Sequence, residues 1–368
     1  MWTSSWRACS PPSVWRGQTE ILAEAARRWQ EPTRPGNDLH RRRLAVSWRD
    51  LNTTVSPETI GNYRLEAPLG ESGQGVVYRA VAADTGRVAA LKLVPPDKFP
   101  DAAARKKFLE DARAAQCLSH PHLRQIHEVG ESGDRVYLVM EYLEGATLKS
   151  LLVSGRVEAE TALEWAAEVA DALAALHAAG LVHGDLRPSR VFVTSQGTVK
   201  LLEAALWRLG VPSGVDLTRD PKLDPARAAA LAPEQLRGRE PGPQSDIHGL
   251  GVLLAEMLTG RAPFLGRNVQ QTVHWVLNRA PDPVGPPAGL DAVLARALAK
   301  DPKARFAGAA DFAAALRAVA AGEEIPAEVA QAAGPAVVVR WTSSLWWGIG
   351  VLVALAVAWF TYLALTRR

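Results

Sequence analysis

The sequence contains few cysteines and carries almost no net charge. Its 368 residues include only Cys9 and Cys117 as cysteines, and the formal net charge is +3. Two cysteines cannot form a disulfide framework, which excludes a small disulfide-stabilised protein and favours a reducing compartment. A chain so close to neutrality lacks the strong positive field of a nucleic-acid-binding protein, so we predict no nucleic-acid partner.

The composition is not that of a disordered chain, and the first residues lack the apolar stretch of a signal peptide. Hydrophobic residues make up 48% of the chain, enough for the core of one large two-lobed domain or of two ordinary domains. Residues 1–58 show no sustained periodicity and no apolar export segment. We expect a disordered N-terminal extension there, apart from a short helix around Glu20–Trp29.

One long hydrophobic run is present, near the C-terminus. Leu345–Leu365 comprises 21 residues without a charged side chain. At about 1.5 Å of rise per residue, a helix of this length spans roughly 30 Å, the thickness of the hydrocarbon core of a bilayer. Tryptophans at its start, and Trp359 and Tyr362 near its end, are typical of interfacial aromatic belts. We predict a single transmembrane helix over 345–365, preceded by a linker over 321–344, with a buried soluble helix as the alternative.

The segment between these two ends changes from strand patterns to helix patterns. Short β-rich runs come first, and the pattern is mostly helical from Leu148 onward. We expect strands over 75–81, 88–94 and 136–142, and helices over 102–116, 159–178, 246–259, 268–278, 290–299 and 309–320. The fold class is therefore α+β, a small sheet with one helix followed by a helical region.

The most informative motif lies around Asp185. Residues 182–191 read VHGDLRPSRV and resemble the catalytic loop of protein kinases, His-Arg-Asp-Leu-Lys-Pro-Glu-Asn. Residues 199–206 read VKLLEAAL and lie where that family has its Asp-Phe-Gly motif. The scaffold of a phosphate-transfer centre is present, while the residues that should hold its metal ion are changed.

Further motifs occur in the order of the same family. Residues 69–78, LGESGQGVVY, resemble its glycine-rich loop, residues 88–92, VAALK, its lysine-bearing strand, and residues 139–145, VMEYLEG, its hinge between lobes. The resemblance covers Tyr63 to Ala320, and the chain is identified as a member of the bacterial eukaryotic-like Ser/Thr protein kinase family, of the membrane-anchored type. This implies a two-lobed protein-kinase-like fold over 59–320, with lobes over 59–141 and 142–320.

The resemblance also implies an ATP site. The backbone of Glu141 and Leu143 would contact adenine behind Met140, while Lys92 would contact the phosphates and pair with Asp111. The other implied nucleotide-binding positions are Gly70, Ser72, Gly75, Val77, Ala90 and Arg190. Away from this site, Glu234 and Arg305 would form a buried ion pair in the framework of the second lobe.

The residues at the catalytic and metal positions depart from the family. Asp185 keeps the position of the catalytic base, and Arg187 replaces the lysine that contacts the transferred phosphate. The Mg²⁺ positions are occupied by Glu203 and Arg190. Mg²⁺ requires oxygen ligands in octahedral geometry, and a guanidinium offers only donors and a positive charge. Arg190 therefore cannot be a ligand, and Glu203, whose extra methylene displaces its carboxylate, is the remaining candidate. Gly184 replaces the arginine that would bind a phosphorylated activation loop.

These departures predict a membrane-anchored, nucleotide-binding pseudokinase that acts as a signalling scaffold. An active Ser/Thr protein kinase with an atypical metal site is the alternative, and an ATP-dependent activity on a non-protein acceptor is a third interpretation. A guanidinium pairs readily with phosphate oxygens, so Arg190 is expected to take the place of Mg²⁺ in binding ATP.

The C-terminal run also predicts location and self-association. The missing export signal predicts a cytoplasmic kinase-like domain held at the cell membrane by one span, although Arg367 and Arg368 argue against this orientation under the positive-inside rule. Gly350, Ala354 and Ala358 recur every four residues and form one small-residue face, which predicts a homodimer in the membrane.

Overall fold

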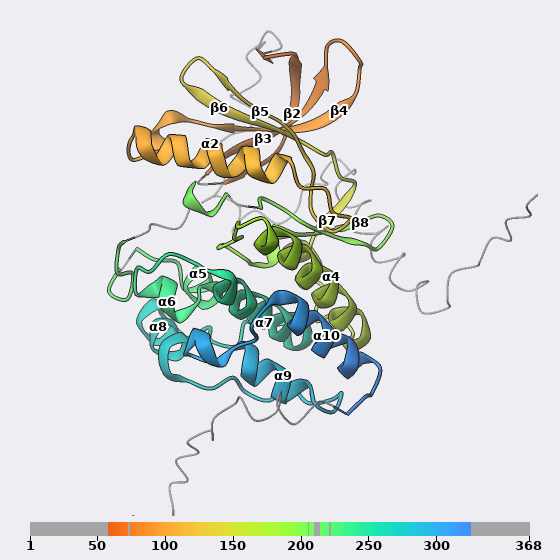
Figure 1. Cartoon of the computed structure of the whole chain (residues 1–368), viewed down its shortest axis with the longest axis vertical. Coiled ribbons are helices and arrows are strands. Elements are labelled where there is room, and N and C mark those ends of the chain that lie inside the picture. The colour runs from red at the N-terminus through yellow and green to blue at the C-terminus, as the bar shows by residue number, and fades with distance from the viewer. Residues whose placement is uncertain (1–57, 73, 205, 210–213, 221, 325–368) are drawn as a thin grey trace, which may run out of the picture. The chain divides into compact units, whose positions relative to one another are not determined.

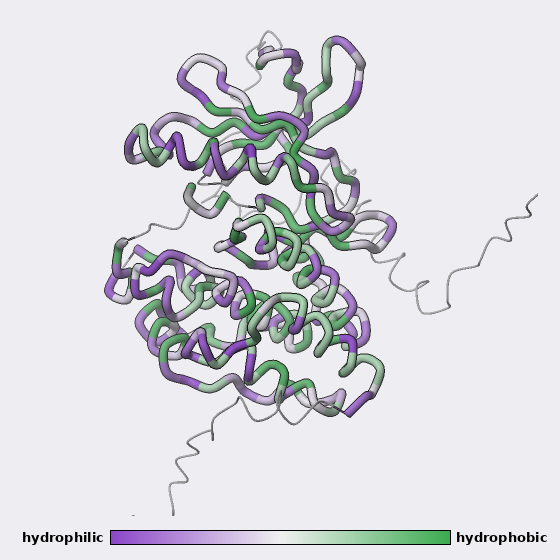
Figure 2. Tube along the Cα trace, in the orientation of Figure 1, coloured by the Kyte–Doolittle hydropathy of each residue, from purple (hydrophilic) through white to green (hydrophobic). Residues whose placement is uncertain are grey.

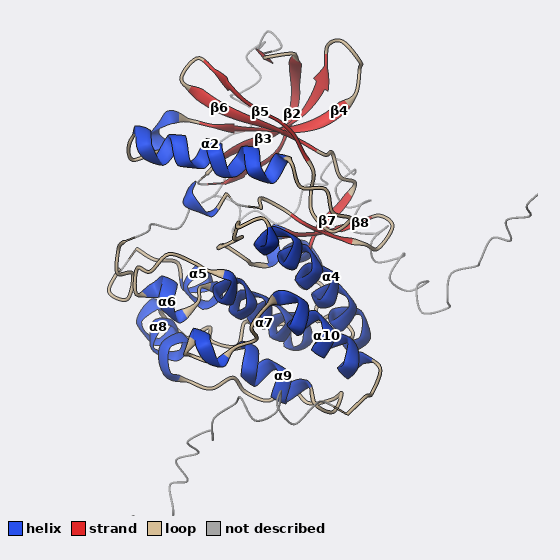
Figure 3. Ribbon diagram, viewed as in Figure 1, coloured by secondary structure: helices blue, strands red, loops and turns tan. Residues whose placement is uncertain are grey.

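The chain forms two lobes over the residues that the computed structural model describes, which are 58–72, 74–204, 206–209, 214–220 and 222–324. A sheet-rich lobe comes first in the sequence, and a helical lobe follows it (Figures 1 and 3). The predicted α+β class and the two-lobed architecture are confirmed for this part of the chain.

The first lobe is built on a six-stranded antiparallel sheet with the strand order β1-β2-β3-β4-β6-β5 within the described residues. Its strands are β1 (Thr59–Ile60), β2 (Tyr63–Ser72), β3 (Gly75–Ala82), β4 (Val88–Val94), β5 (Ile126–Ser132) and β6 (Arg135–Met140). The helix α2 (Ala102–Gln116) lies against this sheet, after the short turn η1 (Pro96–Lys98) (Figure 1). The side chain of Asp101 caps α2 by accepting a hydrogen bond from the backbone of Ala104.

Both faces of the central strands are buried. Successive strand residues point to opposite faces, so Leu138 of β6 packs with Phe108 of α2 in one hydrophobic cluster, while its neighbour Val139 belongs to a second cluster on the other face. All residues of β4 after Val88 are buried. Lys92 lies in this strand, so one buried lysine interrupts an otherwise apolar strand.

The second lobe contains a small sheet and a set of packed helices. The sheet has the order β7-β8-β9, with β7 (Gly145–Thr147), β8 (Val191–Thr194) and β9 (Val199–Leu201). The helices are α3 (Leu148–Leu152), α4 (Ala159–Ala178), α5 (Pro225–Ala230), α6 (Pro233–Leu236), α7 (Pro243–Thr259), α8 (Val269–Asn278), α9 (Leu290–Ala297) and α10 (Ala309–Ala320). Short 3₁₀ turns are η2 (Pro188–Arg190), η3 (Trp207–Leu209) and η4 (Pro302–Ala304).

The core of this lobe is centred on α4 and α7. Both helices are apolar on most of their faces, and α10 packs against α4 on the side of the lobe away from α8 (Figures 1 and 2). A helix that is hydrophobic nearly all round is expected in the interior of a large domain. The rigid α7 carries Asp246 near its start, and this residue supports the functional segment described below.

Several predicted elements have the bounds that the structure shows. Strand 88–94 and helices 102–116, 159–178 and 309–320 are confirmed as predicted. The helix expected to start at Asp246 begins at Pro243, because proline is well tolerated in the first turn, where its missing N–H has no intrahelical partner. The strand expected to reach Tyr142 ends at Met140, and the helix expected to reach Ala299 ends at Ala297.

The two ends of the chain lie outside this description. Among the described residues, no helix is both long and apolar enough to cross a membrane. The predicted span over Leu345–Leu365, most of the linker before it and the N-terminal extension with its short helix fall outside the described residues. These stay predictions.

A buried ion pair joins distant parts of the helical lobe, as predicted. Arg305 donates from Nη1 to Glu234 Oε1 at 2.7 Å and from Nη2 to Glu234 Oε2 at 2.9 Å. Ser245 Oγ donates to Glu234 Oε1 at 2.6 Å, and Arg305 Nε donates to the carbonyl of Ala299 at 2.8 Å. Both ends of the pair are thus fully hydrogen-bonded, which is the condition for a stable buried pair.

Lys300 is a partly buried cation in the same lobe. Its Nζ lies 3.8 Å from the centroid of the Phe264 ring and has no hydrogen-bond partner among the described residues. Burial, together with the charge of Arg305, lowers the pKa of Lys300 from its usual 10.5 to about 7. The protonated lysine therefore destabilises the folded lobe relative to the unfolded chain.

The stability of the protein is expected to rise with pH because of Lys300. The unfolded chain keeps this lysine protonated up to 10.5, whereas the folded chain releases the proton above about pH 7, so unfolding becomes less favourable as the pH rises between these values. Lys300→Met should stabilise the protein near neutral pH and reduce this slope in urea denaturation. The exposed Lys303, replaced in the same way, is the control. An unchanged slope in Lys300→Met would contradict the assignment.

Candidate functional site

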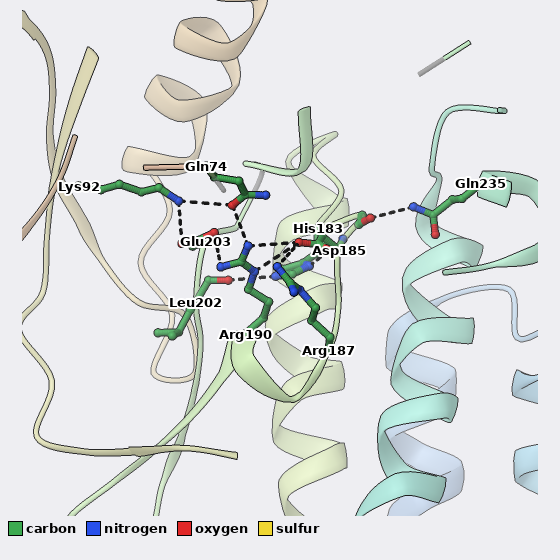
Figure 4. Close-up of polar contacts among 10 residues, drawn as sticks. Gln74, Lys92, His183, Asp185, Arg187, Arg190, Leu202, Glu203 and Gln235 are labelled. Carbon is green, nitrogen blue, oxygen red and sulfur yellow. Dashed lines mark hydrogen bonds and ion pairs between the residues drawn. The ribbon is translucent and has the colours of Figure 1, made fainter. Parts of the chain in front are cut away.

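Charged side chains from three distant segments meet between β4 and the start of the helical lobe. Lys92 comes from β4, Arg190 from the turn η2, and Glu203 from the loop after β9 (Figure 4). Glu203 bridges the two cations: Lys92 Nζ lies 2.7 Å from its Oε1, and Arg190 Nη1 lies 2.6 Å from its Oε2. The backbone of Glu203 has φ of 57°, a left-handed conformation that is uncommon outside glycine. The loop therefore holds this carboxylate at a local conformational cost.

Asp185 belongs to the same cluster. Its Oδ2 lies 3.3 Å from Arg190 Nη2 and 3.3 Å from Arg187 Nη2. Asp185 and Arg190 are buried, and Arg187 is partly exposed. Two arginines thus share the carboxylate that the sequence analysis placed at the catalytic base position.

The glycine-rich segment contributes Gln74. Its side-chain Oε1 accepts hydrogen bonds from Arg190 Nη2 at 2.7 Å and from Lys92 Nζ at 3.4 Å. The chain turns at Gly75, whose φ of 131° favours glycine. Glycine is also required there because a Cβ atom would collide with the carbonyl oxygen of Leu93 in β4. No motif had singled out Gln74. The amide occupies donors of both cations in this conformation.

Asp246 of α7 supports the segment that carries Asp185. Asp246 accepts hydrogen bonds from the backbone N–H of His183 at 2.8 Å and of Gly184 at 2.7 Å, and His177 Nε2 lies 2.8 Å from the same carboxylate. The His183 Nε2 atom lies 2.9 Å from the carbonyl oxygen of Leu202, next to Glu203. These bonds fix the two functional loops relative to each other.

Gly184 is required by its surroundings. It has φ of 68°, and a Cβ atom would lie 2.8 Å from Trp207 Cγ and 2.9 Å from Pro241 Cγ. Its carbonyl accepts a hydrogen bond from Gln235 Nε2 at 2.8 Å. The indole of Trp207 therefore takes the space next to the position where the sequence analysis noted the loss of an arginine, and no side chain fits at residue 184 without movement.

The electrostatics of the cluster follow from burial and pairing. Burial alone would raise the pKa of Glu203, but the charges of Lys92 and Arg190 outweigh it and hold that pKa below its usual range. Burial lowers the pKa of Lys92, and Glu203 opposes this shift. With Arg187 and Asp185 included, three cations face two carboxylates, which leaves an excess of positive charge suited to an anionic ligand.

The partner predicted for Lys92 needs correction. Asp111 of α2 was expected to pair with it, but Lys92 forms its ion pair with Glu203, and Asp111 forms one with Lys107 of its own helix, at 2.9 Å. The physical reason is reach: aspartate is one methylene shorter than glutamate, whereas Glu203 is one methylene longer than the aspartate usual at its position. The longer side chain of Glu203 therefore reaches Lys92 and pairs with it.

The hinge segment follows β6. The Glu141 N–H donates to the carbonyl of Gln125 at 2.9 Å, and Lys200 Nζ lies 3.1 Å from Glu141 Oε2. The Glu141 carbonyl accepts a hydrogen bond from Arg124 Nε at 2.9 Å. The N–H of Leu143 makes no backbone hydrogen bond to the described residues. No sequence motif predicted a role for Arg124.

The other predicted nucleotide-binding positions line the sheet side of this region. Gly70 pairs with Val77, and Ser72 pairs with Gly75, in the β2–β3 hairpin. Ala90 is buried in β4 opposite Met140, the last residue before the hinge. The strand pairing thus brings these positions close to Lys92, which lies opposite Val77.

The donor set does not fit a Mg²⁺ ion. The guanidinium of Arg190 lies between the carboxylates of Asp185 and Glu203 and contacts both. Mg²⁺ needs oxygen ligands at close octahedral distances, whereas Oδ2 of Asp185 and both carboxylate oxygens of Glu203 are ion-paired to Arg190 or Lys92. Across the described residues, no cluster of three or more His, Cys, Asp or Glu side chains suits a metal ion.

Comparison with known proteins gives consistent matches. The family model "Protein kinase domain" matches residues 63–310. A probable serine/threonine-protein kinase of Streptomyces coelicolor is 34% identical over 284 residues, which is 74% of this chain and 42% of that protein. Serine/threonine-protein kinase PknA of Mycobacterium tuberculosis is 32% identical over 286 residues, which is 75% of this chain and 65% of that protein.

A solved structure resembles the described part of the chain. The PknI kinase domain of Mycobacterium tuberculosis superimposes with a TM-score of 0.57 at 26% identity, covering 73% of this chain and 99% of that domain. The chain spans between 42% and 65% of the length of the two curated relatives given above. The similarity concerns the two-lobed region and leaves the rest of those proteins unmatched.

Proposed function

Because this chain belongs to the bacterial Ser/Thr protein kinase family, we propose that it is a nucleotide-binding pseudokinase that acts as a signalling scaffold. The observation that carries this proposal is the position of the Arg190 guanidinium. Its Nη1 lies 2.6 Å from Glu203 Oε2, and its Nη2 lies 3.3 Å from Asp185 Oδ2. A permanent cation stands where the family places a metal ligand.

This arrangement removes two requirements of phosphate transfer. Transfer depends mostly on positioning and on neutralising the phosphate charge, for which the family uses Mg²⁺. The carboxylates that could bind the metal are paired to Arg190, and Asp185 is also shared with Arg187. Asp185 is thus held by two cations and is poorly placed to orient a substrate hydroxyl. An active kinase with an atypical metal site remains the second candidate, and the retained Asp185 is the observation that favours it.

Nucleotide binding is favoured by the same residues. Lys92, Arg187 and Arg190 offer donors to phosphate oxygens, and the cations exceed the carboxylates in the cluster. A guanidinium can bind phosphate in a bidentate manner without any metal. ATP is the ligand that the family implies, and its triphosphate would displace Gln74 from the two cations.

The test is ligand-induced stabilisation of the full-length chain. A nucleoside triphosphate at about 100 times its dissociation constant should stabilise the protein by about 2.7 kcal/mol, in EDTA as well as with Mg²⁺. Arg190→Ala and Lys92→Ala should each weaken binding about tenfold, because each removes a charge-assisted hydrogen bond. Arg267→Ala, at an exposed position, is the control. Stabilisation that requires Mg²⁺ would favour the active kinase instead.

We also propose that the protein is anchored to the cell membrane with this domain in the cytoplasm. The support is the sequence of Leu345–Leu365, 21 residues without a charge. Deleting this segment should move the chain from the membrane fraction to the soluble fraction, and protease added to intact cells should leave the domain uncut. Leucine at Gly350 and Ala354 should abolish dimerisation of the span. A chain found in the soluble fraction with the segment present would contradict the anchor.

A further inference from the structure

Arg124 lies at the hinge and contacts the backbone atom that a nucleotide base would use. Its backbone N–H donates to the carbonyl of Leu201 at 3.0 Å, which fixes it beside β9. Its side chain donates from Nε to the carbonyl oxygen of Glu141 at 2.9 Å. Glu141 follows β6 directly, and β6 pairs with β4, the strand of Lys92. Arg124 therefore contacts both the hinge and the end of β9, two residues before Glu203.

The terminal nitrogens of Arg124 are donors without acceptors. Neither Nη1 nor Nη2 has a hydrogen-bond or ion-pair partner among the described residues. The nearby carboxylate of Glu141 does not use them, because it pairs with Lys200. The two terminal NH₂ groups, with four N–H bonds, are thus available as donors next to the hinge carbonyl.

Arg124 is charged at neutral pH. Burial lowers its pKa to about 10, and the negative charges of Glu203 and Glu141 oppose the shift. Even at this pKa the guanidinium is protonated at neutral pH. The hinge of this protein therefore presents a cationic donor beside its carbonyl acceptor.

A purine ring discriminates sharply between such donors and acceptors. Guanine and hypoxanthine offer O6 and N7 as two adjacent acceptors, which an arginine can contact with two donors, whereas adenine offers N7 beside an amino group that only donates. At this hinge, the adenine amino group would lie next to the guanidinium of Arg124, so that two donors face each other. The carbonyl oxygen of Glu141 already accepts a hydrogen bond from Arg124. The N–H of Leu143 is a further donor, for N1 of adenine or for O6 of a 6-oxopurine, whose own N1 carries a proton.

We infer that Arg124 determines the base specificity of the nucleotide site and selects 6-oxopurine nucleotides over adenine nucleotides. This inference rests on the proposed nucleotide binding and adds the identity of the base. The two parts of the site then have different roles: Lys92 and Arg190 bind the phosphates, and Arg124 binds the base. A nucleotide of the guanine or hypoxanthine class would satisfy both parts.

The experiment measures dissociation constants of GTP, ATP and tripolyphosphate for the full-length chain in EDTA, by calorimetry. The wild-type protein should bind GTP at least about tenfold more tightly than ATP. Arg124→Leu should bring the ratio of the two constants close to one or invert it, with the affinity for tripolyphosphate unchanged. Arg113→Leu, an exposed position on α2, should retain the wild-type ratio. The melting temperature of each variant in the absence of ligand reports whether it is folded.

The three ligands separate the failure of the inference from the failure of the proposed function. Tripolyphosphate binding combined with equal or tighter binding of ATP than GTP would overturn the role of Arg124 and leave the phosphate site intact. A GTP preference that survives in Arg124→Leu would do the same. If neither the nucleotides nor tripolyphosphate bind, the proposed nucleotide binding is wrong and the inference fails with it.

Discussion

Arg305→Met is expected to lower the free energy of unfolding by about 3–5 kcal/mol, because it leaves a buried carboxylate without its counter-ion. Glu234 and Arg305 are 7% and 3% exposed, so water cannot replace the lost partner. The substitution also removes the hydrogen bonds of Arg305 to the carbonyl oxygens of Gln244 and Ala299. This pair ties the loop after α9 to α6 and to the start of α7.

Urea denaturation of the full-length chain measures this effect. The matched control is Arg317→Met, since Arg317 pairs with Asp171 on the surface and such a pair contributes only about 0–1 kcal/mol. The double variant Glu234→Leu, Arg305→Met should recover much of the stability, because no charge is left unpaired. Equal losses in Arg305→Met and Arg317→Met would show that the buried pair has no special role.

The long elements of the fold could be predicted from the sequence, and the short ones could not. Helices 102–116, 159–178 and 309–320 carry enough turns for a clear apolar period, and β4 is a continuous apolar run around one lysine. The strands β7 and β9 each have three residues, too few for any period to appear. Their pairing depends on contacts between segments far apart in the chain.

The sequence predicted most of the residues of the candidate site, but not all of the contacts between them. Motif order brought Lys92, Asp185, Arg190 and Glu203 to one place, and the structure joins all four in a single network. The partner of Lys92 could not be deduced, because it depends on side-chain reach and on the position of α2. Neither Gln74 nor Arg124 could be recognised from the sequence, since a glutamine in a glycine-rich turn and an arginine before a strand are usually surface residues, whereas Gln74 is buried here.

The protein is expected to transfer no γ-phosphate to itself or to generic protein substrates, with Mg²⁺ or with Mn²⁺. Loss of metal neutralisation should cost several kcal/mol of transition-state stabilisation, or roughly 10³-fold or more in rate. We expect the positive charge of Lys92, Arg187 and Arg190 to hold a triphosphate about as firmly in the substrate as in the transition state, and such uniform binding does not accelerate the chemical step.

The measurement that tests this account most directly is transfer of labelled γ-phosphate by the full-length chain, compared with Asp185→Asn at equal concentration. The account predicts the same background signal from both proteins, with ATP and with GTP, and with either metal ion. Transfer by the wild-type protein that disappears in Asp185→Asn would contradict it and identify the chain as an active kinase with an unusual metal site.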